Sequence, residues 1–137
     1  MRKLIVSAIV LCTAGVIAAT AYSQAPQPAP ANNVVAYFTS ELEKDPSRIV
    51  RMQSVAIPAR GGNNFHRHPG DQWAAVQEGE ITFTVKGQAP RVLKVGDSVY
   101  IPRGTIHRNQ NLTDRPARSV ELVIIDKDKP QTEQVPD

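Results

Sequence analysis

Two of the three histidines in this chain, His66 and His68, are separated by a single residue. On an extended strand, residues two apart direct their side chains to the same face, so both imidazoles can reach one point. Because neutral imidazole is the commonest metal ligand among side chains, a third ring from a distant strand, that of His107, would complete a site for a divalent ion. Taken singly, each histidine could instead be a structural, hydrogen-bonded side chain.

The residues around His107 are typical of tight turns that aim a side chain. Glycines permit backbone conformations with positive φ, and proline ends a strand. Their spacing resembles the second motif of the cupin superfamily, in particular of its small single-domain members. Every position of that motif is matched, by Gly96, Pro102, Gly104, His107 and Asn111.

The first cupin motif is matched with two departures. His66, His68 and Gly79 are in register, but Gln72 stands where the motif has glutamate, and Gly61 is one residue away from the expected glycine. The resemblance covers residues 34–126. It implies an all-β double-stranded β-helix, or jelly-roll barrel, with the metal site inside. The ligands that it implies are His66, His68 and His107, with Gln72 in the fourth position.

Gln72 changes the chemistry expected of such a site. A glutamine oxygen is neutral and a weaker donor than a carboxylate, so a divalent ion such as Fe, Mn, Ni or Zn would keep its full positive charge. The same substitution is compatible with a barrel that has lost its metal and only binds ligands. Asp71 is an alternative source of a carboxylate if a β-bulge turns it inward.

The pattern of short strands and turns predicts an antiparallel sandwich or barrel without reference to any family. Strands are expected at residues 49–57, 73–77, 80–86, 98–101 and 117–126. Ile81, Phe83 and Val85 should share one face of their strand. Val120, Leu122 and Ile124 should do the same. Residues 40–43 have mild helical character.

The two ends of the chain differ from this centre. Residues 1–23 have a basic start, an uncharged apolar run and small residues near the end, which predicts a secretory signal peptide; an uncleaved membrane anchor is the alternative. Residues 24–33 are a proline-rich linker, residues 34–126 are the cupin domain, and residues 127–137 are expected to be a loose polar tail. We therefore expect a periplasmic or secreted protein.

Charge and cysteine content exclude two classes of protein. The chain has 16 basic and 13 acidic residues, and removing Arg2 and Lys3 with the leader leaves 14 against 13, or +1. That balance gives no electrostatic footprint for nucleic acid. The single cysteine, Cys12, lies in the leader, so the mature protein would have no disulfide.

The resemblance implies a dioxygenase-like, metal-dependent oxidoreductase that acts on a small chelating organic substrate. No catalytic residue separate from the metal ligands is evident, and with no spare histidine a histidine-based epimerase is disfavoured. The alternative is a non-catalytic periplasmic module that binds a small molecule. Open sheet edges are compatible with a homodimer, which the sequence does not decide.

Overall fold

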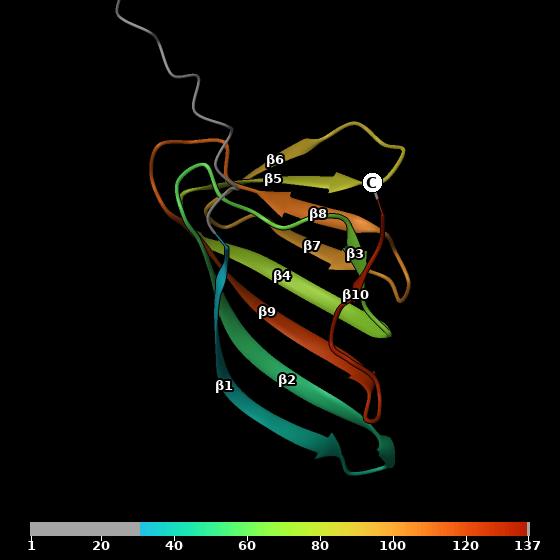
Figure 1. Cartoon of the computed structure of the whole chain (residues 1–137). Helices are drawn as coiled ribbons and strands as arrows, with labels where there is room; N and C mark the ends of the chain where they lie inside the picture. Colours follow the sequence, from blue (N-terminus) through green and yellow to red (C-terminus); the bar gives the residue numbers. More distant parts are fainter. Residues whose placement is uncertain (1–30, 137) are drawn as a thin grey trace, which may run out of the picture.

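The computed structural model describes residues 31–136, which form two antiparallel five-stranded sheets facing each other (Figure 1). The first sheet has the strand order β1 (Asn33–Leu42), β2 (Asp45–Ile57), β9 (Ala117–Asp126), β4 (Gly70–Glu78) and β7 (Ser98–Ile101). The second has the order β10 (Glu133–Gln134), β3 (His66–Arg67), β8 (His107–Gln110), β5 (Glu80–Val85) and β6 (Arg91–Lys94). This all-β jelly-roll arrangement confirms the expected fold.

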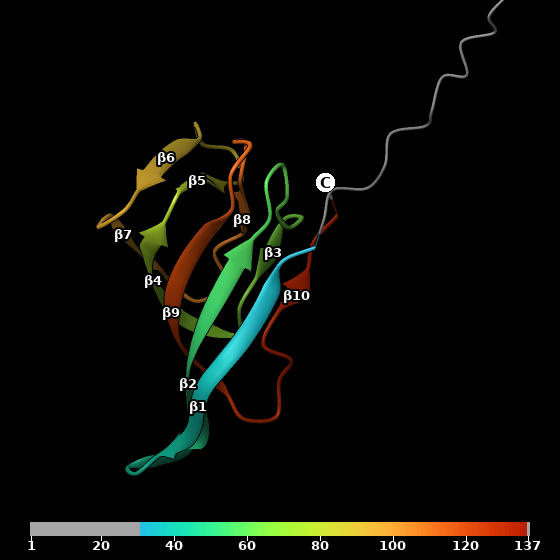
Figure 2. The same ribbon diagram turned by 90° about the vertical axis from the view of Figure 1, so that its left-hand side faces the viewer.

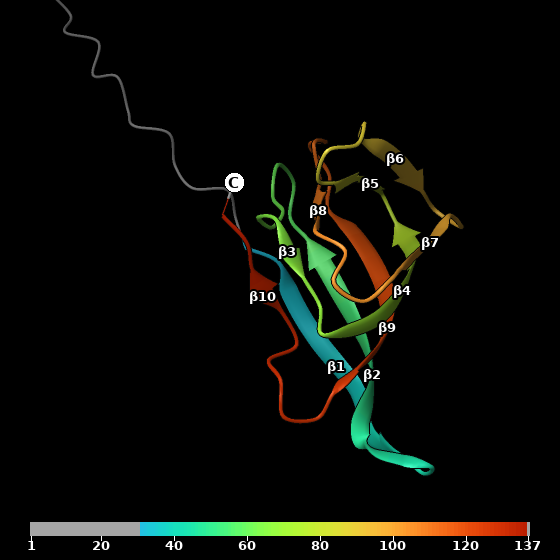
Figure 3. The ribbon, with the colours of Figure 1, turned by 90° about the vertical axis from the view of Figure 1, so that its right-hand side faces the viewer.

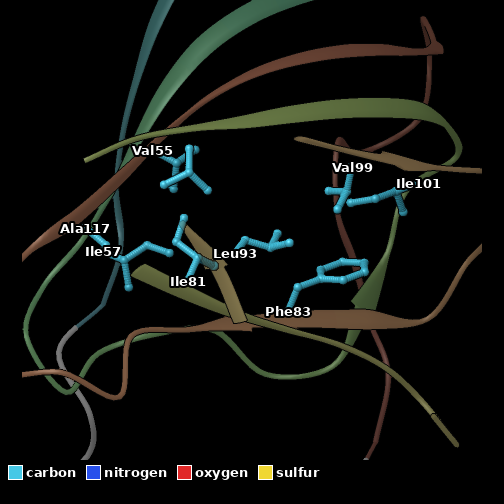
Figure 4. Close-up of a cluster of buried hydrophobic side chains, with 9 residues drawn as sticks. Val55, Ile57, Ile81, Phe83, Leu93, Val99, Ile101 and Ala117 are labelled. Atoms are coloured by element: carbon cyan, nitrogen blue, oxygen red, sulfur yellow. The ribbon is translucent and has the colours of Figure 1, made fainter. Parts of the chain in front are cut away.

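The interior lies between the sheets, as the two side views show (Figures 2 and 3). At the end nearer the β5–β6 hairpin it is an apolar core, whose side chains converge from both sheets in Figure 4. The expected face of β5 is confirmed: Ile81 and Phe83 are buried, and Val85 packs against the same cluster. The members of the core are Val55, Ile57, Val76, Ile81, Phe83, Leu93, Val99, Ile101 and Ala117.

The alternation of β9 places a charged residue in the interior. Val120, Leu122 and Ile124 share a face, as expected, but it is the half-buried outer face of the sheet. The inner face holds Ser119, Glu121, Val123 and Ile125, all buried. β9 lies between β2 and β4. Its inner side chains therefore lie next to the inner side chains of both neighbouring strands.

Two local expectations were wrong. Residues 40–43 are not helical, because β1 runs to Leu42 and pairs with β2 along its length. This pairing within the β1–β2 hairpin outweighs a weak helix propensity. Residues 127–136 are not a loose tail either: β10 pairs with β3, and Lys127 N–H donates to Ser47 O. The polar composition of residues 127–136 gave no indication of β10, which pairs with the distant strand β3.

The signal peptide expected at residues 1–23 lies outside the described residues, as does most of the linker expected at 24–33. The first strand begins at Asn33, the last residue of that expected linker. Between residues 31 and 136 there is no helix with the length and apolarity needed to cross a membrane.

Candidate metal centre

The three histidines meet between β3 and β8. His66 and His107 are direct cross-strand partners in the second sheet, and His68 follows just after β3. One ring nitrogen from each lies within 4.8 Å of the other two. Nitrogens bound to one ion at about 2.1 Å lie at most about 4.2 Å apart, so the cluster is close to ligating geometry. The expectation that the rings converge is confirmed, and the cluster could hold a metal.

The Nδ1 atom of each ring is tied to a backbone carbonyl. The Nδ1···O distances are 2.9 Å for His66, 2.7 Å for His68 and 3.0 Å for His107, to the oxygens of Asn64, Gln131 and Thr105. A carbonyl only accepts, so each neutral ring carries its proton on Nδ1 and leaves the Nε2 lone pair free. The Nε2 atoms of His68 and His107 are buried without a hydrogen-bond partner among the described residues. This is the tautomer that a metal requires.

Burial keeps the three rings neutral. Loss of solvent lowers the pKa of His66 and of His68, against the opposing effect of their backbone hydrogen bonds. For His107, which has no exposed surface, the same cause lowers the pKa to about 4. Because only a neutral imidazole can ligate, the site does not need to lose protons at neutral pH before it binds an ion.

We expect the His107 ring in metal-free protein to stay neutral down to a pH of about 4, whereas an ordinary histidine protonates near 6.5. Above pH 6.5 the ring is neutral in both the folded and the unfolded chain. As the pH drops from 6.5 toward 4, only the unfolded chain takes up this proton, so the free energy of unfolding falls. A pH titration of the imidazole signals by NMR measures the pKa of His107 directly. A value near 6.5 would contradict the buried position of the ring.

Gln72 on β4 presents an unused oxygen in the same region. Its Nε2 donates to the carboxylate of Glu121 at 2.8 Å, which fixes the orientation of the amide. The opposite atom, Oε1, is buried and has no hydrogen-bond partner in the described part of the chain. A buried carbonyl-type oxygen without a donor is costly, and a cation would satisfy it. Gln72 therefore has an oxygen available for the fourth ligand position, and its role as a ligand stays a prediction.

Glu121 is the residue of this site that the sequence did not identify. It is buried, and its carboxylate accepts hydrogen bonds from Gln53 Nε2 at 3.0 Å, Gln72 Nε2 at 2.8 Å and Ser119 Oγ at 3.1 Å. Burial raises its pKa, and the three hydrogen bonds oppose that rise. The available signal was a glutamate in the middle of an otherwise apolar alternating strand.

A cavity of about 250 Å³ gives access to the site. His66, His68, Gln72 and Glu121 line its inner end, while His107 lies deeper, with no exposed surface. The segment that leads into β10 supplies another wall, through Gln131, Thr132 and Gln134. The two sheets and the C-terminal segment thus line one small cavity that is open to solvent on one side and contacts two of the imidazoles.

A model of the cupin domain, Cupin_2, matches residues 53–125, more than half of the chain. The chain belongs to this family. The matched region of the cupin runs from Gln53 to Ile125 and so contains all three histidines, Gln72 and Glu121. The site described above therefore lies within the matched cupin domain.

Two curated relatives are similar to part of this cupin. It is 37% identical over 65 residues to the uncharacterized protein YdbB of Bacillus subtilis (strain 168). The matched region covers 47% of this chain and 54% of YdbB. This cupin is 35% identical over 68 residues to the dimethylsulfoniopropionate lyase DddQ of Ruegeria pomeroyi, which covers 50% of this chain and 33% of the lyase. The matches thus span about half of one relative and a third of the other.

Solved structures share the cupin fold at low identity. The crystal structure of DddQ from Ruegeria pomeroyi superposes with a TM-score of 0.61 and 24% identity, over 76% of this chain and 51% of that one. An oxalate oxidase in complex with glycolate gives 0.59 and 23%, over 76% and 55%. A cupin domain from Bordetella pertussis Tohama I gives 0.59 and 23%, over 72% and 98%.

The carboxylate considered as an alternative ligand points away from the cupin's interior. Asp71 Oδ1 accepts from the Tyr100 hydroxyl and from Arg103 N–H, both at 3.1 Å, and no bulge interrupts the ladder at this residue. The idea that Asp71 reaches the metal site through a bulge is therefore wrong. The interior carboxylate is supplied by Glu121, from a different strand.

The C-terminal segment should matter for metal binding, because Gln131 O is the acceptor that orients His68. We expect a chain ending at Asp128 to bind a divalent ion about 10- to 100-fold more weakly, the usual effect of losing an outer hydrogen-bond partner. Chelator competition measures this affinity. The control Gln131→Ala keeps the backbone carbonyl and should retain most of it. Equal affinity in the truncated and full-length chains would contradict the role of the segment.

Proposed function

We propose that this cupin is an exported, metal-dependent, dioxygenase-like enzyme that acts on a small chelating organic substrate. One observation carries the proposal: three neutral imidazoles present ring nitrogens within 4.8 Å of one another, and the two of them that line the cavity, His66 and His68, share that lining with Gln72, whose Oε1 has no hydrogen-bond partner among the described residues. Such a donor set, with no anionic side chain in direct contact with the ion, suits a divalent metal that keeps positions open for substrate.

His66, His68, His107 and Gln72 would hold the ion, which we expect to be Fe, Mn, Ni or Zn. When bound, the ion would supply Lewis acidity toward the oxygens of a chelating substrate and a site for oxygen chemistry. The other groups of the protein would orient these four side chains. Three backbone carbonyls hold the rings, and Glu121 holds the Gln72 amide so that its oxygen faces inward.

The cavity contains no obvious proton-transfer group. Glu121 is the one carboxylate among the described residues that line it, and three donors already occupy that carboxylate. This supports chemistry driven by the substrate's own electrons over a reaction that needs a mobile base. The relatives named as a lyase and as an oxalate oxidase act on small organic molecules, which supports a small substrate here.

A second candidate is a periplasmic module that binds a small molecule without turnover. It is favoured by the neutral Gln72 oxygen, a weaker donor than a carboxylate, so that the site could function with little metal. In that case Gln72 Oε1 would accept a hydrogen bond from the ligand. The two candidates differ in whether metal is present in the purified protein and whether substrate is consumed.

Metal analysis and oxygen uptake together test the proposal. We expect purified protein to contain about one Fe, Mn, Ni or Zn per chain, His107→Ala to contain almost none, and the wild type to consume oxygen with a diketone or flavonol substrate. A metal-free wild type that keeps its fold and is stabilised by ligand would instead support the binding module. Metal without oxygen uptake on any chelating substrate would count against the dioxygenase-like reaction.

Export is a separate part of the proposal and has its own test. We propose cleavage near residue 23 and a periplasmic or secreted product, supported by the character of residues 1–23. Cell fractionation followed by N-terminal sequencing of the product decides it. A protein that starts at Met1 and stays with the membrane would indicate an uncleaved anchor.

A further inference from the structure

We propose that the substrate carries a single chelating head that meets the metal, and that the remainder of the molecule is uncharged and bears hydroxyl or carbonyl groups. This inference rests on the proposed metal site and specifies what else the cavity accepts. Two features of the cavity support the inference: the charges of the residues that line it, and the side-chain amides in its lining that make no hydrogen bond within the described residues.

Positive charge is missing from the cavity. Among the described residues that line it there is no lysine or arginine, and its one charged member, Glu121, is acidic. Three arginines on neighbouring strands have contacts of their own: Arg51 donates to Thr39 and Gln131, Arg67 pairs with Glu133 at 2.8 Å, and the Arg108 guanidinium lies 4.6 Å from the centre of the Phe65 ring. A second carboxylate or a phosphate on the substrate would lose its hydration without gaining a cation, which is strongly unfavourable.

Uncommitted amides take the place of charge. The Oδ1 of Asn32 is buried with no hydrogen-bond partner in the described part of the chain. Asn109 and Gln134 line the cavity, and no hydrogen bond within residues 31–136 uses their side-chain amides. By contrast, the amides of Gln53 and Gln131 are bonded to each other and to Glu121 or Arg51.

A carboxamide offers one acceptor and two donors, and a hydroxyl group is both donor and acceptor. Asn32, Asn109 and the exposed Gln134 can therefore each hydrogen-bond a hydroxyl or carbonyl group on the ligand. An alkyl tail would leave the buried Asn32 oxygen without a partner and would displace water from the other two amides. At about 250 Å³ the cavity is smaller than typical pockets for drug-sized ligands. The ligand should thus be a small, oxygen-rich molecule.

Three hydroxamates with a common head and different tails test this inference. Butanohydroxamate, 4-hydroxybutanohydroxamate and succinomonohydroxamate share a bidentate oxygen chelator and end in a methyl, a hydroxyl or a carboxylate. Binding is measured by calorimetry on Zn²⁺-loaded, full-length protein, in which no oxidation consumes the probe. We expect the hydroxyl tail to bind about five-fold more tightly than the methyl tail, which corresponds to one net hydrogen bond. The carboxylate tail should bind at least about ten-fold more weakly than the hydroxyl tail.

Variants separate the cavity's contribution from that of the metal. Asn109→Ala and Gln134→Ala should remove the preference for the hydroxyl tail, while Gln88→Ala, in the turn between β5 and β6, should keep it. Asn109→Lys should shift the preference toward the carboxylate tail. Equal or tighter binding of the carboxylate tail by wild-type protein would overturn the inference, as would no binding of any probe to Zn²⁺-loaded protein. Failure to load Zn²⁺ at all would instead contradict the proposed metal site.

Discussion

Replacing Gln72 with glutamate alone should raise the affinity for a divalent ion far less than the same change combined with Glu121→Gln. In the single variant, a new carboxylate would stand beside Glu121, where the present amide donates at 2.8 Å. Two carboxylates at that distance share a proton, and the ion must displace it to gain a full anionic ligand. In the double variant the ligating carboxylate has an amide neighbour and no competitor.

Four proteins make this prediction quantitative: wild type, Gln72→Glu, Glu121→Gln and the double variant. We expect the double variant to bind at least about ten-fold more tightly than the sum of the two single effects predicts, a coupling of about 1.4 kcal/mol. Chelator competition at pH 7 gives the affinities. Glu80→Gln, a neutralisation at an exposed surface pair, serves as control and should change little. Strictly additive effects would show that Gln72 and Glu121 do not act together on the ion.

Among glycine-to-alanine substitutions near the site, Gly70→Ala should be the most destabilising. A Cβ at this position would lie 1.8 Å from Ile124 O and 2.6 Å from the Cα of Ile125. Both are backbone atoms of β9, so the clash cannot be relieved by a side-chain rotation. β4 and β9 would have to separate, and Gln72, two residues further along β4, would move with them. We expect a loss of about 3 kcal/mol or more.

Urea unfolding of metal-free protein measures this loss. Gly87→Ala is the matched control: its Cβ would meet no atom within 4 Å, and its φ of +84° costs a non-glycine residue about 1 to 2 kcal/mol. Gly70→Ala should also weaken metal binding, whereas Gly87→Ala should not. If the two variants were equally stable, the close packing of β4 on β9 at Gly70 would be incorrect.

Sequence reasoning found the histidine cluster because its geometry is local or fixed by motif spacing. His66 and His68 are two residues apart on extended chain, and Gly104, whose N–H donates to His68 O at 3.0 Å, belongs to the turn that leads to His107. Asn111, the last residue of the second motif, donates its side-chain amide to the carbonyls of Ile57 and Arg115.

Glu121 and the C-terminal segment could not be found in this way, because their positions depend on pairing between distant strands. Either face of β9 could have been the inner one from its alternation alone, since Leu122 and Ile124 are as apolar as Val123 and Ile125. Only the register with β4 and β2 turns Glu121 inward. Similarly, nothing in the composition of residues 127–136 indicates that Gln131 O meets His68.

The central claim is that one ion is held jointly by three imidazoles and the Gln72 amide. Anomalous diffraction at the metal edge, from crystals of protein loaded with Zn²⁺ or Mn²⁺, tests it most directly. The account predicts a single anomalous peak about 2.1 Å from the Nε2 atoms of His66, His68 and His107, with Gln72 Oε1 as a further ligand. Loaded crystals with no peak among these rings, or with an ion bound by other residues, would contradict it.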